Sequence, residues 1–237
     1  MVSTTLKKRV LITGANGLLG SAIATLFRDK EWEVFAITRG DELKVVGVTH
    51  LVKDLLLPNS GVEIVEATRP HIVINCAADQ SNFSLYKPEL DGKSLDQISK
   101  DLLRVNLIAP LEILTTAVKF GCKVAINISS VESLHAKAGH SLYGASKAAL
   151  ESLTRSAALE LAPMRVLGLR LGLIHREGIE EDWLEGVTSW NSNSPLGRMG
   201  NPGEIARAIY SLISDDFQWA TGTILDLDGG MNASPAW

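Results

Sequence analysis

Short apolar runs rich in β-branched residues alternate along the chain with longer segments whose apolar residues recur at helical spacing. We expect strands at 9–13, 34–38, 48–52, 71–77, 124–129, 165–171 and 223–227. We expect helices at 18–30, 61–68, 94–120, 143–161 and 202–213, and a helix or lid at 177–190. Such alternation predicts an α/β fold with a mostly parallel sheet and helices on both faces.

The connections between these segments are short. The loops richest in Gly, Ser and Asn, at 189–203 and 228–235, are too small to separate two domains. There is no internal repeat and no low-complexity tract. A length of 237 residues fits one large α/β domain, so we expect residues 1–237 to form a single doubly wound domain.

Composition narrows the classes of partner. The formal net charge is -4 and the pI is near 5.8, which argues against a nucleic-acid partner. No run of eighteen apolar residues occurs, so we expect no membrane span. The apolar run near the N-terminus is too short for a signal peptide, and we therefore expect a cytoplasmic protein.

Cysteine and histidine usage gives no sign of a metal site or a disulfide. Cys76 and Cys122 each lie in an apolar run without a C-x-x-C pattern, and we interpret both as reduced, buried thiols. His135 and His140 lie five residues apart in a loop with no third ligand, so no metal is expected.

A glycine-rich turn, TGANGLLG at 13–20, leaves the first strand and opens the first helix. Glycines at such a turn permit a tight bend, close approach of a pyrophosphate and close packing of helix on strand. The helix N-terminus offers free N–H groups to the phosphates. The turn predicts a Rossmann dinucleotide site, although a plain strand–helix turn stays open, and it lacks the lysine of a P-loop. The contacts expected here are Gly14, Asn16, Gly17, Leu18 and Leu19.

The end of the second strand bears on cofactor choice. An acidic residue there would bind a ribose 2′-hydroxyl, but the chain has Thr38 and then Arg39. A guanidinium suits a 2′-phosphate, which favours NADP(H), while Asp41 and Glu42 keep NAD(H) possible. Asp54, after the third strand, is a candidate acceptor for the adenine amino group or a turn residue.

Tyr143 and Lys147 are the main candidates for catalysis. Their spacing places both on one face of a helix, about one turn apart. A tyrosine ionises near pH ~10, and a neighbouring cation favours the phenolate and lowers that pKa. Ser130, thirteen residues upstream at a strand end, has a hydroxyl that suits a carbonyl oxygen. The three residues predict proton transfer at a carbonyl or alcohol oxygen.

Together these residues resemble the short-chain dehydrogenase/reductase family over nearly the whole chain. The matching features are TGANGLLG, Asp54, NCAA at 75–78, Asn106 in LLRVNLIAP, Ser130, Tyr143, Lys147 and the C-terminal stretch PLGRMGNPGEIARAIYSLISDDFQWATGTILDLDGG. The resemblance implies a small-molecule substrate, transfer from the pro-S side of the nicotinamide, and a homotetramer or homodimer.

The resemblance also implies residue roles. Tyr143 would exchange the proton with the substrate oxygen, Lys147 would hold the nicotinamide ribose, and Ser130 would polarise the carbonyl. Asn106 would hold a water in a relay that reaches Lys147. Further cofactor contacts are implied for Leu55, Asn75, Ala77, Ala78, Gly172 and Ile174, besides Tyr143 and Lys147 themselves.

Three features depart from the family pattern. The glycines are spaced G-x-x-G-x-x-G, as is usual in the longer branch of nucleotide-sugar epimerases and dehydratases, but there is no room for that branch's C-terminal domain. Arg176 replaces the threonine that usually binds the carboxamide. Cys76 and Ala78 replace Asn and Gly of the usual N-N-A-G.

The segment 175–200 falls where family members cover their substrate. Trp183 and Trp190, seven residues apart, would share a helix face and either line a pocket or pack in the core. His175 and Arg176 would face an anionic group or form a salt-bridged surface pair. The candidate substrate contacts are His140, His175, Arg176 and Trp183.

Three functions are therefore considered. The first is an NADP(H)-dependent oxidoreductase acting on a carbonyl or secondary alcohol. The second is an epimerase or dehydratase that uses the cofactor transiently. The third is a dinucleotide sensor without activity, against which the intact set of Ser130, Tyr143 and Lys147 argues.

Overall fold

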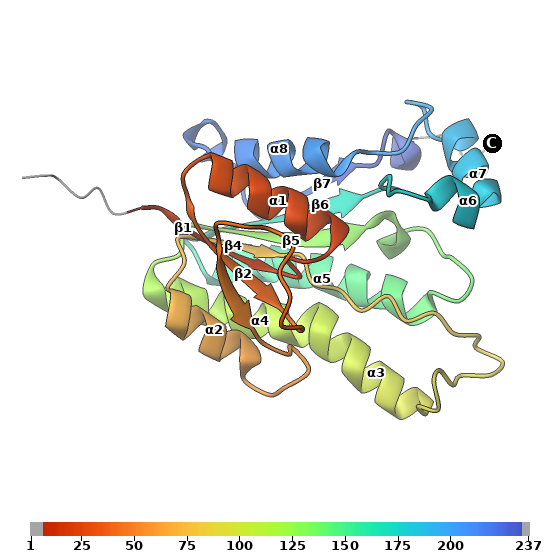
Figure 1. Ribbon diagram of the computed structural model, residues 1–237, viewed down its shortest axis with the longest axis horizontal. Coiled ribbons are helices and arrows are strands. Elements are labelled where there is room, and N and C mark those ends of the chain that lie inside the picture. Colours follow the sequence, from red (N-terminus) through yellow and green to blue (C-terminus); the bar gives the residue numbers. More distant parts are fainter. Residues whose placement is uncertain (1–6, 234–237) are drawn as a thin grey trace, which may run out of the picture.

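The computed structural model describes residues 7–233 and places helices on both faces of one β-sheet (Figure 1). The strands are β1 (Arg9–Thr13), β2 (Glu33–Thr38), β3 (Thr49–Val52), β4 (Ile72–Asn75), β5 (Val124–Ser130), β6 (Arg165–Leu171) and β7 (Ile224–Leu227). They lie in the order β3-β2-β1-β4-β5-β6-β7, and every pair of neighbours is parallel. The chain changes direction across the sheet between β1 and β4, where a doubly wound sheet opens a crevice at the carboxyl ends of its strands. The predicted α/β fold is confirmed.

The helices are α1 (Leu18–Asp29), α2 (Ser60–Thr68), α3 (Leu95–Leu103), α4 (Ala109–Ala117), α5 (Ser141–Glu160), α6 (Ile179–Asp182), α7 (Leu184–Asn193) and α8 (Pro202–Leu212). Helices α1 and α8 cover one face of the sheet, and α2, α4 and α5 cover the other (Figure 1). In the described part of the chain, no helix is long and apolar enough to cross a membrane.

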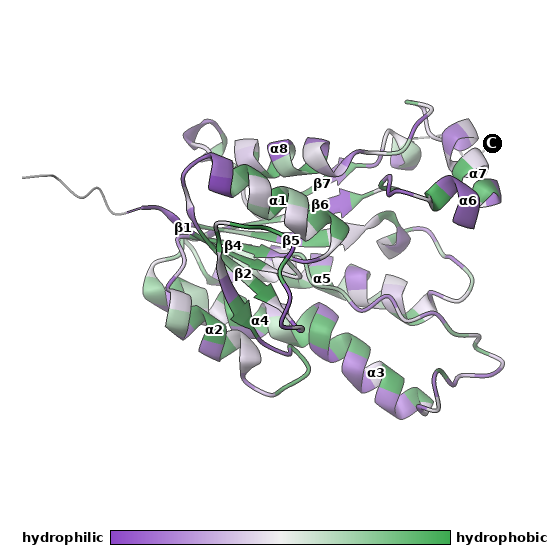
Figure 2. Cartoon of the chain, viewed as in Figure 1, coloured by the Kyte–Doolittle hydropathy of each residue, from purple (hydrophilic) through white to green (hydrophobic). Residues whose placement is uncertain are grey.

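Two apolar clusters fill the space between the sheet and its helices. Ile12 of β1 packs in the cluster that contains Phe27 of α1, whereas its neighbour Leu11 packs in the cluster that contains Ile113 of α4. Successive residues of a strand point to opposite faces, so one apolar run supplies both clusters. The central strands are therefore mostly hydrophobic (Figure 2), as expected for a parallel sheet covered on both sides.

The helix expected at 94–120 is interrupted. A π-helical turn at Arg104–Ile108 separates α3 from α4, and a 3₁₀ turn at Val118–Phe120 ends the segment. The π-helical turn carries Asn106, whose side chain bonds both backbone groups of Asp79 and the Ser146 hydroxyl. Apolar spacing along the whole segment does not reveal so short a turn.

Two other expected elements are shorter than the pattern suggested. Strand β4 ends at Asn75, because the next two N–H groups, of Cys76 and Ala77, donate to the Thr13 hydroxyl at 3.1 Å instead of to a neighbouring strand. The segment expected at 177–190 forms two helices, α6 and α7. They are separated at Trp183, whose backbone (φ -151°, ψ 53°) is not helical.

Candidate active site

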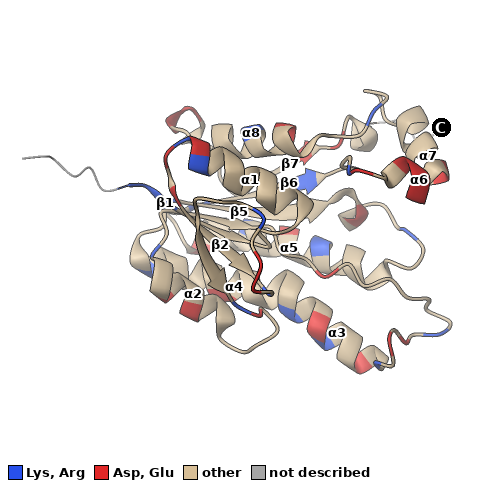
Figure 3. Cartoon of the chain, viewed as in Figure 1, with Lys and Arg blue, Asp and Glu red and all other residues tan. Residues whose placement is uncertain are grey.

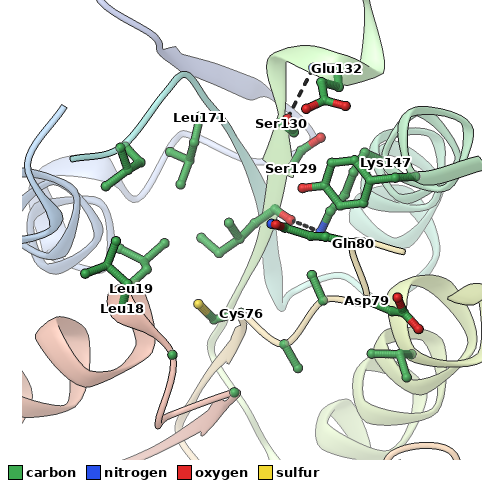
Figure 4. A pocket seen from close by; sticks show the side chains of 18 of the residues that line it. Leu18, Leu19, Cys76, Asp79, Gln80, Ser129, Ser130, Glu132, Lys147 and Leu171 are labelled. Atoms are coloured by element: carbon green, nitrogen blue, oxygen red, sulfur yellow. Dashed lines mark hydrogen bonds between the residues drawn. The ribbon is translucent and has the colours of Figure 1, made fainter. Parts of the chain in front are cut away.

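A cleft of about 1070 Å³ lies at the carboxyl ends of the strands, where the loops after β1 to β6 meet (Figure 4). It brings together most of the residues that the sequence singles out. These are Gly14, Gly17, Leu18, Leu19, Arg39, Asp54, Leu55, Ala77, Ala78, Ser130, His140, Tyr143, Lys147, Gly172, Ile174, Arg176 and Trp183. The other candidates, Asn16, Asn75, Asn106 and His175, do not line it.

The glycine turn forms one end of the cleft. Gly14 has φ +67°, and a Cβ atom there would lie 2.7 Å from the Cα of Ala77. A Cβ atom on Gly20 would lie 2.2 Å from the Gly14 carbonyl oxygen. Only glycine fits either position. Gly17 precedes α1 without a side-chain cap, which leaves the first N–H groups of the helix open toward the cleft.

Asn16 supports this end of the cleft from outside. Its Oδ1 accepts a hydrogen bond from the Lys44 N–H at 2.9 Å, and its Nδ2 donates to the Glu42 carbonyl. These bonds attach the glycine turn to the loop that follows β2. Asn16 therefore orients that loop, and no contact with the cleft is found for it.

Arg39 and Asp54 line the same end. Arg39 is exposed and makes no hydrogen bond or ion pair with any residue in 7–233, so its guanidinium is available to a ligand. Thr38, the last residue of β2, donates its hydroxyl to the Gly40 carbonyl at 2.6 Å and thereby shapes the turn that carries Arg39. Asp54 accepts a bond from the Leu56 N–H at 2.9 Å, so it shapes its own turn as well as lining the cleft.

Tyr143, Lys147 and Ser130 meet in the middle of the cleft. Tyr143 and Lys147 lie on successive turns of α5, with 6% and 2% of their surface exposed. The Lys147 ammonium donates to the Ile128 carbonyl at 2.8 Å and lies 5.6 Å from the centre of the Tyr143 ring. Ser130 is the last residue of β5, and its Oγ accepts a bond from the Glu132 N–H at 3.2 Å (Figure 4).

Burial is the main influence on the pKa values of Tyr143 and Lys147. It raises the pKa of Tyr143 to about 12, although hydrogen bonds from Ser130 and Gln80 lower it in part. It lowers the pKa of Lys147 to about 8. The sequence predicts that Lys147 lowers the Tyr143 pKa, but burial and the nearby charge of Glu132 raise this pKa instead. Tyr143 is consequently a protonated phenol at neutral pH.

Asn75 and Asn106 lie behind the cleft. Asn75 is buried between β1 and β5, and its Nδ2 donates to the Asn127 Oδ1 at 2.8 Å. Asn106 accepts a bond from the Asp79 N–H at 2.7 Å and donates to the Asp79 carbonyl at 2.9 Å. Asn106 thus fixes the loop that follows β4, whose residues Ala77 and Ala78 do line the cleft.

The segment between β6 and α7 forms the far end of the cleft. Arg176 pairs with Asp182 at 2.7 Å, and His175 lies 3.7 Å from Glu180. Both partners belong to the acidic helix α6 (Figure 3). Of the two readings that the sequence left open for His175 and Arg176, the structure favours a salt-bridged pair.

The two tryptophans of this segment do not share a helix face, because Trp183 interrupts the helix. Trp183 packs on Gly186 and is 43% exposed, whereas Trp190 of α7 packs on Gly172, which directly follows β6. Both side chains nevertheless line the cleft and form part of its wall.

A buried ionic network that the sequence does not predict lies next to Tyr143 and Lys147. Glu151, 4% exposed, lies one turn beyond Lys147 on the same face of α5. It accepts bonds from the hydroxyls of Ser129 at 2.7 Å and Ser133 at 2.6 Å, and forms a two-bond pair with Arg170 at 2.6 and 3.0 Å. The network thus holds both ends of the turn that carries Ser130. Its only sequence signal is a charged residue on the helix face shared with Tyr143 and Lys147.

Both cysteines are free thiols; Cys122 is buried as expected, whereas Cys76 is only partly buried. Cys76 lines the cleft and Cys122 lies in the core. Burial raises the pKa of each thiol to about 12, so neither is a reactive thiolate. Within 7–233, no group of three or more His, Cys, Asp or Glu side chains is arranged to hold a metal ion.

Comparison with known proteins extends these observations. The family described as enoyl-(acyl carrier protein) reductase matches residues 64–232, and the RmlD substrate binding domain matches residues 8–91. The 3-oxoacyl-[acyl-carrier-protein] reductase FabG of Vibrio harveyi is 30% identical over 94% of this chain and 97% of its own. Carbonyl reductase family member 4 of Xenopus laevis is 29% identical over 95% of this chain and 98% of its own.

Solved structures give the same result. A 4-hydroxyisoleucine dehydrogenase complexed with NADH matches with a TM-score of 0.85 and 28% identity, covering 97% of this chain and all of that one. The aldohexose dehydrogenase of Thermoplasma acidophilum matches with a TM-score of 0.83 and 25% identity, covering 98% and 96%. The chain belongs to the short-chain dehydrogenase/reductase family of oxidoreductases.

Proposed function

We propose that this protein is an NADP(H)-dependent oxidoreductase that interconverts a carbonyl and a secondary alcohol in a small metabolite, with Tyr143 as the acid or base. The supporting observation is that Tyr143, Lys147 and Ser130 lie together in a cleft that begins at the glycine turn. When bound there, the nicotinamide would supply or accept the hydride.

The residues of the cleft fit a dinucleotide. No residue larger than glycine could occupy positions 14 and 20. The turn formed there leads into the open N-terminus of α1, where a pyrophosphate would be held. Arg39 would bind a ribose phosphate at one end. Leu55, Ala77, Ala78, Gly172 and Ile174 line the path toward Tyr143.

The chain's own groups would then move the proton. The Tyr143 phenol donates a proton to the carbonyl oxygen, and the Ser130 hydroxyl donates a hydrogen bond to the same oxygen. The Lys147 ammonium, fixed by the Ile128 carbonyl, would stabilise the phenolate that remains and would hold the cofactor ribose. Asn106 keeps the loop after β4 in place, and its implied water relay remains a prediction. The segment 175–200, of which Ile179, Trp183 and Trp190 reach the cleft, would cover the substrate.

Arg39→Ala is expected to raise the Kd of NADPH by on the order of tenfold, equivalent to about 1.4 kcal/mol, and to change the Kd of NADH far less. The reason is that only NADPH carries the 2′-phosphate that a guanidinium at this position would bind. Quenching of tryptophan fluorescence during titration gives both constants. Arg155→Ala, which removes an exposed arginine of α5 outside the cleft, is the control. Equal losses for the two cofactors would show that Arg39 does not contact the 2′-phosphate.

Net consumption of NADPH with a panel of ketones and aldehydes tests the proposed function. A reductase consumes NADPH in proportion to the alcohol formed. The second candidate, an epimerase or dehydratase, converts its substrate with no net consumption. It is favoured by the glycine spacing and by the match of residues 8–91 to the RmlD domain. Binding of NADPH without any conversion would point to a sensor. The oligomeric state, expected to be a homotetramer or homodimer, stays a prediction.

A further inference from the structure

Two side chains that line the cleft beside Ser130 and Tyr143 neither donate nor accept the transferred proton. Glu132 follows Ser130 by two residues, and His140 precedes Tyr143 by three. The Glu132 N–H bonds the Ser130 hydroxyl at 3.2 Å, and the His140 ring meets the Tyr143 ring edge to face with centres 5.8 Å apart. The two chain segments that present the catalytic hydroxyls therefore each add one of these residues beside them.

Glu132 and His140 form a pair. Nδ1 of His140 lies 2.9 Å from Oε2 of Glu132, and their side chains are 13% and 18% exposed. Neither side chain has another hydrogen bond in the described part of the chain, so Oε1 of Glu132 and Nε2 of His140 remain free. Both residues line the main cleft as well as a smaller hollow of about 490 Å³ beside it. Both side chains thus belong to a wall that ligands can reach.

The charge of the pair limits what it can bind. A carboxylate with a histidine has a net charge of zero or -1, depending on whether the imidazole is protonated. A second anion next to Glu132 would be repelled. Arg176, a nearby cation, is already paired with Asp182, and the Lys137 ammonium lies 4.6 Å above the Trp183 ring. A neutral hydroxyl suits the pair best, because it donates to Oε1 of Glu132 and accepts from, or donates to, Nε2 of His140.

We propose that Glu132 and His140 bind a hydroxyl group on the carbon next to the reacting carbonyl, so that the substrates of this protein are α-hydroxy ketones or aldehydes and the vicinal diols formed from them. This inference rests on the proposed function, since it assigns the substrate class of the same site. The position of the pair beside both Ser130 and Tyr143 is what places the hydroxyl next to the reacting carbon.

The proposal can be tested with pairs of ketones in which each hydroxyl group of one member is replaced by a methyl group in the other. Acetoin and 3-methylbutan-2-one form one such pair, and dihydroxyacetone and pentan-3-one form another. A site that hydrogen-bonds a substrate hydroxyl rejects the apolar analogue strongly, because its own polar groups are then left unpaired. We expect kcat/KM of the wild type to be at least about tenfold higher for the hydroxylated member of each pair.

Two substitutions locate this preference. Glu132→Leu removes both carboxylate oxygens and should reduce the preference to within about threefold, equivalent to less than about 0.7 kcal/mol. Glu132→Gln keeps one acceptor oxygen and should give an intermediate ratio. Glu185→Gln, on the exposed side of α7, is the matched control and should keep the wild-type ratio. The Kd of NADPH and the unfolding temperature establish that each variant is folded.

The other outcomes overturn the proposal. If the wild type does not discriminate, or if both Glu132 variants slow the two members of a pair equally, the pair does not bind a substrate hydroxyl. If the wild type consumes NADPH with other carbonyls but with neither hydroxy ketone, the substrate class is wrong while the proposed function stands. If it neither binds NADPH nor reduces any carbonyl, the proposed function fails and the substrate class fails with it.

Discussion

Tyr143→Phe is expected to lower kcat/KM for carbonyl reduction by about 10²–10⁴-fold and to affect the Kd of NADPH much less. The substitution removes the phenolic hydroxyl that would protonate the substrate oxygen. It leaves the ring, which packs edge to face on His140 and lies beside the Lys147 ammonium. Steady-state kinetics with the best ketone of the panel and a fluorescence titration with NADPH measure the two effects. Full turnover in the variant would show that another group supplies the proton.

The pH profile of reduction provides a further prediction about the same residues. Tyr143 has a pKa of about 12 and stays protonated as an acid throughout the neutral range. Lys147, with a pKa of about 8, is charged below that pH and loses its charge above it. The rate of reduction should therefore be level at lower pH and fall as the pH rises through about 8. The Lys147→Met variant should lack this fall, and a rate that rises through pH 8 would contradict the assignment.

Arg170→Met is expected to lower the free energy of unfolding by about 3–5 kcal/mol. Glu151 is almost completely buried and depends on the guanidinium for two of its four hydrogen bonds, so the substitution leaves an unpaired charge in the interior. Urea denaturation at neutral pH measures the loss. Arg155→Met is the control, because Arg155 is an exposed arginine of α5.

The same network should also affect the reaction, since its hydrogen bonds to Ser129 and Ser133 hold the turn that carries Ser130. Glu151→Gln keeps the size of the side chain and should be the milder variant in both stability and kcat. If Arg170→Met unfolds at the same urea concentration as the wild type, the buried pair contributes nothing to the fold.

The sequence predicts most of the fold because its signals are local. Strands β1 and β6 begin and end where their apolar runs do, and α1 starts directly after the glycine turn. The early end of β4 could not be predicted in this way. It depends on the hydroxyl of Thr13, which is 63 residues away from Cys76 along the chain. The π-helical turn around Asn106 likewise depends on a distant partner, the loop at Asp79.

The candidate site shows the same division. Tyr143, Lys147 and Ser130 are identified by spacing within a short stretch, and the structure brings them into one cleft. Glu151, on α5, could not be recognised as part of this region, because its partner Arg170 lies on a different element, β6. A position in a motif also does not show whether a residue contacts the ligand or holds other parts of the chain in place. Asn16 and Asn75 match the family pattern, but in the structure their side chains bond other parts of the chain.

The measurement that tests the central claim most directly is the transfer of deuterium from NADPH labelled at the pro-S position of C4 of the nicotinamide. The carbonyl panel is incubated with the wild type and this cofactor, and the alcohols are analysed by mass spectrometry. Our account predicts one deuterium on the carbinol carbon for each NADPH consumed, and almost none formed by Tyr143→Phe in the same time. Bound NADPH with no alcohol formed from any carbonyl would contradict the assignment of this cleft as the site of hydride transfer, whereas unlabelled alcohol would show transfer from the other face of the nicotinamide.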